Sequence, residues 1–231
     1  MIQYQNTQFE TQNELFEFLT KNKKELIAQK RAIIKHSDAV QYVLKNEASK
    51  SFFVNNETET IQATIVMNTT NIMDSHDDVH IDGLWKKTLS ENRNIFHLQE
   101  HKMSFDSIIA SGKDISVSTQ KKTWKELGYN VAGETEALIF VSNISKKRNN
   151  YMFQQYSEGF VNNHSVGMQY VKIALAINDE DYPEEKETWN ILKNKEPWLL
   201  PELFLFLFVV IRDRISMISD YGYNLFISIP W

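Results

Sequence analysis

The chain contains no cysteine. This absence excludes disulfide bonds, thiolate metal sites and a cysteine nucleophile, and it is typical of proteins from a reducing cytoplasm. An excess of positive charge is also missing, because 25 Lys and Arg residues face 30 Asp and Glu, which gives a formal net charge of −5. The composition therefore gives no indication of nucleic-acid binding.

The sequence also lacks the patterns typical of a secretory signal and of a membrane span. The first 19 residues have neither a basic start nor a long apolar stretch, so no secretory signal is predicted. The apolar run at residues 199–211 is only 13 residues long and includes Pro201 and Glu202. A membrane span needs about 20 apolar residues. We therefore expect a buried strand or helix in this run, and no membrane partner.

The residues that are present divide the chain into three regions. Hydrophobic residues make up 42% of the 231 residues, enough to build a core for one domain with appended segments. Residues 12–47 contain no Gly or Pro, and their apolar side chains recur at spacings near three and four, which predicts helices. We expect a helical N-terminal arm (1–50) that packs on the domain or on a partner, a β-rich domain (51–190) and an apolar C-terminal segment (191–231).

The β-rich region consists of short runs of β-branched and aromatic residues, which predict strands. These runs are residues 51–55, 61–67, 108–110, 115–118, 136–141 and 164–175. Short helices are expected at 84–92 and 149–157. The predicted fold class is therefore α+β, with a mainly antiparallel, β-barrel-like core that is closed or nearly closed, peripheral helices and the N-terminal helical arm.

A candidate nucleophile lies where a polar, turn-prone segment runs into a predicted strand. Ser165 begins this strand, and Gly167 follows it closely, so that backbone can approach a substrate there. A serine hydroxyl is a weak nucleophile at neutral pH and needs a general base. The six histidines of the chain are the candidates for that base.

Two histidines lie four residues apart in another apolar run. His101 ends the run and precedes polar residues, a position from which a strand can deliver a side chain to a cleft. His97 and His101 could instead be zinc ligands on one helical face, but the glutamate between them, Glu100, is at the wrong offset for His-Glu-x-x-His. Taken alone, each histidine fits a structural, hydrogen-bonded role.

The acidic segment at residues 74–83 lacks the alternating oxygen ligands, central glycine and closing glutamate of an EF-hand. A turn between a strand and a short helix explains its Asp, Ser and Gly content. We expect neither a metal nor another cofactor.

In this order, these segments resemble the prohead (capsid maturation) proteases of tailed phages, which are similar in fold to the herpesvirus maturation protease, assemblin. The family motif Asp-x-x-x-Asp leading to Gly-hydrophobic matches Asp74, Asp78 and Gly83. The apolar run ending in the catalytic histidine matches residues 95–101, and Ser-hydrophobic-Gly-hydrophobic matches residues 165–168. The resemblance covers residues 62–177. Beyond about Asn190 the chain departs from the family pattern.

The resemblance implies that Ser165 is the nucleophile and His101 the general base of a serine endopeptidase. The acidic position of the family motif makes Asp78 the candidate third member. Glu100 and a two-residue dyad are the alternatives, because herpesvirus relatives use a second histidine after the serine, and this chain has none after His164.

The family further implies cleavage of phage scaffold and major capsid proteins, and of the protease itself, inside the immature head in the host cytoplasm. It leaves a homodimer open. Two alternatives remain: a non-catalytic capsid-assembly or scaffold component on the same fold, and an unrelated β-rich binding domain.

Overall fold

A computed structural model describes residues 1–36, 52–55, 59–74, 78–91, 94–130, 132–161, 163–170, 172–193, 206–210, 215–216 and 224–229. Its helices are α1 (Gln12–Lys21), α2 (Lys23–Ala32), α3 (Lys86–Ser90), α4 (Asn150–Ser157), α5 (Pro183–Lys193) and the 3₁₀ turn η1 (Gly112–Asp114). Its strands are β1 (Ile2–Tyr4), β2 (Thr7–Phe9), β3 (Lys35–His36), β4 (Phe52–Asn55), β5 (Thr60–Thr69), β6 (Asp78–His80), β7 (Asn94–Gln99), β8 (Ile108–Ser111), β9 (Ile115–Thr123), β10 (Glu134–Ser145), β11 (Ser165–Tyr170), β12 (Ile173–Ile177), β13 (Phe206–Val210), β14 (Ile215–Ser216) and β15 (Asn224–Ile229).

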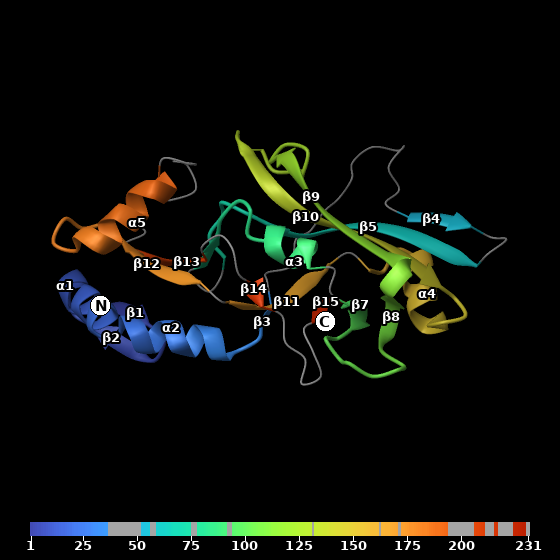
Figure 1. Ribbon diagram of the computed structural model, residues 1–231, viewed down its shortest axis with the longest axis horizontal. Coiled ribbons are helices and arrows are strands. Elements are labelled where there is room, and N and C mark those ends of the chain that lie inside the picture. The colour runs from blue at the N-terminus through green and yellow to red at the C-terminus, as the bar shows by residue number, and fades with distance from the viewer. Residues whose placement is uncertain are drawn as a thin grey trace.

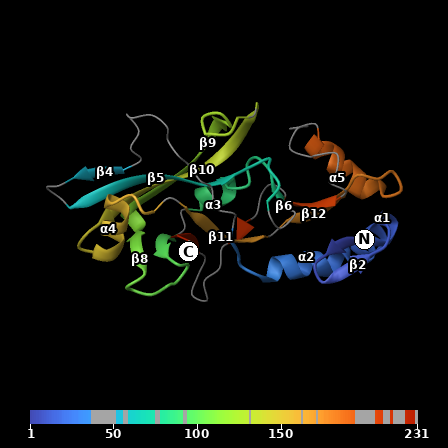
Figure 2. The ribbon, with the colours of Figure 1, turned by 180° about the vertical axis from the view of Figure 1, so that it is seen from behind.

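The molecule is elongated. The N-terminal elements and α5 lie at one end, and β4 and α4 lie at the other (Figure 1). Figure 2 shows the same order from behind, with β11 in the middle of the molecule. Strands β4, β5, β8, β9 and β10 overlap the strand ranges predicted from β-branched and aromatic runs, and the run at 164–175 divides into β11 and β12.

One antiparallel sheet of four strands, in the order β4-β5-β10-β9, covers one side of the core. Along β5, Ile61, Ala63, Ile65 and Met67 are buried at every second position, as the period of a strand requires when one face meets the core. Strands β5 and β10 pair from Thr69 and Ala137 to Thr60 and Ser145, with one irregularity between Leu138 and Ile139.

A second sheet brings the end of β7 level with the beginning of β11. Its order is β14-β11-β15-β7-β8, and β3 also pairs with β11. Strand β15 lies between the two, parallel to β7 and antiparallel to β11. Backbone position 228 is opposite both Leu98, near the end of β7, and Ser165, the first residue of β11. Residues that follow β7 therefore lie at the same end of the strands as the beginning of β11.

A third sheet has the order β12-β13-β6, and β13 and β6 are parallel. Apart from this pair and β15–β7, the named strands pair antiparallel. The chain is thus mixed α+β with mostly antiparallel sheets, as predicted. A closed barrel requires the first and last strands of a sheet to pair, and among the described strands none of the sheets closes in this way. The closed form of the expected barrel-like core is therefore wrong for the described residues, and the nearly closed form stays a prediction.

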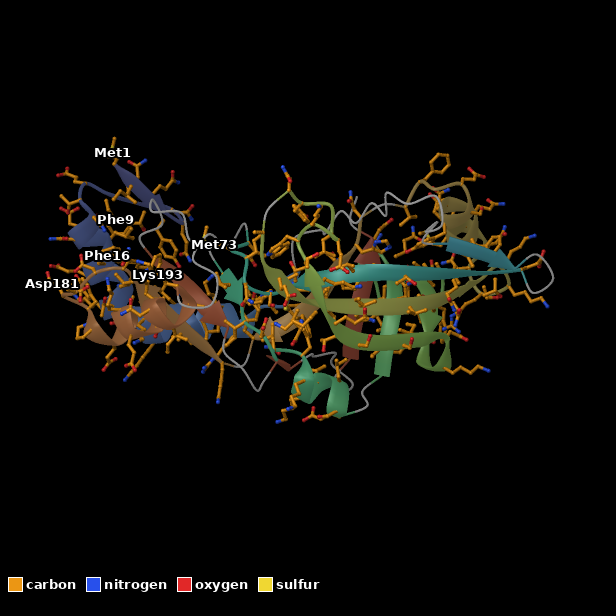
Figure 3. All side chains as sticks on the ribbon, turned by 90° about the horizontal axis from the view of Figure 1, so that it is seen from above. Met1, Phe9, Phe16, Met73, Asp181 and Lys193 are labelled. Atoms are coloured by element: carbon orange, nitrogen blue, oxygen red, sulfur yellow. The ribbon has the colours of Figure 1, made fainter. Side chains whose placement is uncertain are left out.

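The arm packs into the same hydrophobic cluster as the sheets. Leu15, Phe16 and Leu19 of α1 are fully buried, at the i, i+1 and i+4 spacing of one helix face. The ring of Phe16 meets that of Tyr182 edge-on, with 5.6 Å between centroids. Figure 3 places Phe16 at the same end of the molecule as Asp181 and Lys193, which flank and end α5.

Polar contacts also join the arm to the rest of the chain. Lys23 Nζ lies 2.6 Å from the buried Glu185 of α5, and Lys30 Nζ lies 2.7 Å from the buried Asp78 of β6. In addition, the Gln169 side chain of β11 donates a hydrogen bond to a carbonyl of the arm. The helices α1 and α2 fall within the predicted helical range, whereas residues 37–47 of that range, and the boundary at 50–51, lie outside the described residues.

The apolar run at 199–211 includes strand β13, and its other residues lie outside the described part of the chain. Within the described ranges, every helix is too short or too polar to cross a membrane.

Candidate active site

His101 follows β7 in a tight turn with an unusual backbone. The amide of Lys102 donates to the carbonyl of Gln99 at 3.1 Å, and Glu100 and His101 have φ of 56° and 55°. Positive φ at both central residues is the requirement of a type I′ turn, which Asn and Gly normally fill. A residue with a Cβ costs roughly 1–2 kcal/mol in this region. The local sequence thus works against the turn, as is common at functional sites.

Ser165 lies opposite this turn. The Oγ of Ser165 is 2.8 Å from the Nε2 of His101, across 64 residues of sequence. Ser165 is the first residue of β11, and its exposed fraction is 3%. The geometry permits the Ser165 hydroxyl to donate to Nε2, the hydrogen bond that a serine needs from its general base. The structure therefore brings together the two residues that the sequence analysis paired.

The structure does not bring Asp78 to this pair. Asp78 lies in β6 and contacts Lys30, and its amide donates to the Asp74 carboxylate. His80, two residues further along β6, lies 2.9 Å from the hydroxyl of Tyr170 at the far end of β11. Ser165 and Tyr170 are five residues apart, about 16 Å in a strand. Asp78 therefore lies near the end of β11 that is remote from Ser165.

Glu100, the other acid considered for the third position, lies in the turn next to His101. It accepts a hydrogen bond from the Gln99 side chain at 3.2 Å and pairs with the ammonium of Lys102. These contacts of the Glu100 carboxylate are therefore with its sequence neighbours in the turn.

A buried group of hydrogen-bonded polar side chains includes residues close in sequence to His101 and Ser165. The hydroxyl of Tyr156, in α4, is 2.9 Å from Nε2 of His97 and 2.8 Å from Nε2 of His164. The other ring nitrogen of His97 is 2.9 Å from the hydroxyl of Ser142. His97 therefore has the structural, hydrogen-bonded character expected of it. Neither Tyr156 nor Ser142 has a local signal in the sequence, since both contacts depend on tertiary packing.

Burial keeps this group uncharged. Burial, together with the nearby His164, lowers the pKa of His97 well below its usual range. Burial lowers the pKa of His164 to about 3 and raises the pKa of Tyr156 well above its ordinary value. All three side chains are therefore neutral at pH 7.

Acidification should weaken the fold through His164. Between the ordinary pKa of 6.5 and the folded value of about 3, the unfolded chain binds a proton that the folded chain does not. The free energy of unfolding should therefore fall as the pH falls through this window. His164 alone should lower it by about 2 kcal/mol between pH 7.5 and pH 5. Urea unfolding at the two pH values measures this loss, which should shrink in His164→Gln. An unchanged pH slope in that variant would contradict the assignment.

Within the described residues, no group of three or more His, Cys, Asp or Glu side chains is placed to hold a metal ion. Comparisons with protein-family models, with curated proteins and with solved structures found no match to the chain.

Proposed function

We propose that the protein is a serine endopeptidase of the prohead-protease type, in which Ser165 is the nucleophile and His101 the general base. The observation that supports this most is the 2.8 Å separation of His101 Nε2 and Ser165 Oγ. Motif order alone had paired these residues, and they lie 64 positions apart. The unusual backbone of the turn that presents His101 gives further support.

The proposed reaction is acyl transfer. Nε2 of His101 removes the proton from Ser165 as Oγ attacks a peptide carbonyl carbon, and a bond forms between Oγ and that carbon. When the C–N bond breaks, the same nitrogen donates the proton to the leaving amine. Water then attacks the ester carbon and gives a proton to His101. The bond between that carbon and Oγ breaks, Oγ takes the proton back from His101, and the acid is released. The pair works as a dyad in this scheme, because Asp78 lies elsewhere.

The resemblance to prohead proteases supplies the proposed substrates and place of action. They are phage scaffold and major capsid proteins and the protease itself, cleaved inside the immature head in the host cytoplasm during maturation. Incubation of the purified chain with an unstructured protein, followed by mass spectrometry of the fragments, tests the activity. We expect cleavage by the wild type and none by Ser165→Ala. Equal fragmentation by both proteins would refute the proposal.

One observation favours an alternative from a different class. Ser165 has an exposed fraction of only 3%, so little of this residue is open to a peptide. A closed site of this kind would suit a capsid-assembly or scaffold component that keeps the fold without catalysis. Such a component would bind capsid or scaffold protein with equal affinity as wild type and as Ser165→Ala, and would cleave neither.

A further inference from the structure

The hydroxyl of Tyr156 joins the two chain segments that carry the candidate catalytic pair. His97 lies in β7, four residues before His101, and His164 directly precedes Ser165. The Tyr156 hydroxyl is 2.9 Å from one imidazole and 2.8 Å from the other. Strands β7 and β11 are not neighbours, because β15 lies between them. Tyr156 is thus a side-chain connection between β7 and the residue that precedes β11, and the sheet order of the described strands does not pair these two strands directly.

This connection constrains the protons of the group. A tyrosine hydroxyl has one hydrogen, so it can donate to only one of the two Nε2 atoms. The other Nε2 must then carry a hydrogen and donate to the tyrosine oxygen. At least one of His97 and His164 is therefore the Nε2–H tautomer. The hydroxyl of Ser142 contacts the other ring nitrogen of His97 and can donate or accept a hydrogen bond. It therefore satisfies His97 in either tautomer.

The hydrogen bonds of Tyr156, His97 and His164 depend on direction, whereas apolar contacts at the same place would not. His97 is completely buried, and Tyr156 and His164 are 1% and 6% exposed. Polar side chains cost free energy in such a place unless they are hydrogen-bonded, so each must keep its position to satisfy the others. The positions of His97 and His164 in turn fix the backbone next to His101 and Ser165.

We infer that Tyr156 is a positioning residue for the catalytic pair, holding the His101 turn and the beginning of β11 in register through His97 and His164. This inference rests on the proposed function for its effect on rate. Removal of the hydroxyl takes away the partner that the two imidazoles share, so the side-chain link between the segments is lost while their backbone link through β15 remains. A displacement of about 1 Å between reacting groups can cost about a hundredfold in rate.

Tyr156→Phe tests the inference, and Tyr170→Phe is a matched control. Tyr170 is also buried, and its hydroxyl also contacts a histidine, His80, at 2.9 Å, but at the other end of β11. The readout is the rate of modification of Ser165 by a fluorophosphonate, resolved into its maximal rate and its half-saturating concentration. We expect Tyr156→Phe to lower the maximal rate by tenfold to a hundredfold, with little change in half-saturation. Tyr170→Phe should stay within about twofold of wild type. Equal effects of the two variants, or no effect of Tyr156→Phe, would overturn the inference.

A substitution at His164 gives a second test should Tyr156→Phe fold poorly. His164→Gln places an amide close to the position of Nε2 and can still meet the tyrosine hydroxyl, whereas His164→Leu cannot. The inference predicts labelling at a near wild-type rate for Gln and a loss of tenfold or more for Leu. Equal rates in two folded variants would overturn it.

Histidine NMR separates failure of this inference from failure of the proposed function. Long-range ¹H–¹⁵N correlations should show that at least one of His97 and His164 is the Nε2–H tautomer. They should also show that the Nε2 resonance of His101 moves in Tyr156→Phe but not in Tyr170→Phe. If the wild type is not labelled, the proposed function fails, and a shift of His101 in Tyr156→Phe alone still supports the positioning role. An unmoved His101, or two Nδ1–H tautomers, would overturn that role.

Discussion

Replacement of Ser165 by alanine should abolish peptide-bond cleavage while leaving the fold intact. The change removes one hydroxyl, and the backbone pairing of β11 with β15 does not depend on it. His101→Ala removes the base and should have a similar effect on turnover. Where residues act as one catalytic unit, a single loss reduces kcat by about 10⁴ to 10⁶, and a second adds little. We therefore expect the double variant to be hardly slower than either single variant.

Cleavage rates of the three variants, with thermal unfolding as the control for folding, measure this effect. Additive losses in the double variant would show that the two residues do not act together. A wild-type rate in Ser165→Ala would remove the serine from the mechanism, whatever the behaviour of His101.

The second large effect should be a fall in the free energy of unfolding when Lys30 is replaced. Lys30→Met removes the ammonium that lies 2.7 Å from the Asp78 carboxylate, whose side chain is 1% exposed. Loss of one partner from a buried ion pair costs about 3–5 kcal/mol, because the remaining charge stays in a poorly solvated place. Asp78→Asn combined with Lys30→Met removes both charges and should recover part of this loss. Urea unfolding of the single and double variants measures both quantities.

This comparison also decides the role of Asp78. As part of an ion pair remote from Ser165, Asp78 should affect stability and leave the labelling rate of folded protein within a few-fold of wild type. If instead folded Asp78→Asn is labelled orders of magnitude more slowly at unchanged stability, Asp78 orients His101 after all.

The sequence predicted the elements whose signal is local. Runs of β-branched residues marked β5 and β10, and the spacing of Leu15, Phe16 and Leu19 marked α1. The pairing of His101 with Ser165 came from the resemblance of the motif order to prohead proteases, which is not a local signal. Local pattern and motif order together were therefore enough for the fold class and for the central pair.

Contacts between distant elements could not be read in this way. Lys30 and Asp78 are 48 positions apart, and nothing in either segment indicates the other. The parallel pairing of β15 with β7 depends on a C-terminal segment that departs from the family pattern. The closed barrel failed for a related reason, since alternation along a strand predicts its faces but not which strand lies at each sheet edge.

The central claim is that His101 activates the hydroxyl of Ser165. Its most direct test is reaction of the native protein with a fluorophosphonate between pH 5 and 9, with the modified residue identified by tandem mass spectrometry. We predict modification at Ser165 across this range and loss of reaction in His101→Ala. Absence of modification in folded protein across this range, or modification that persists in His101→Ala, would contradict the account.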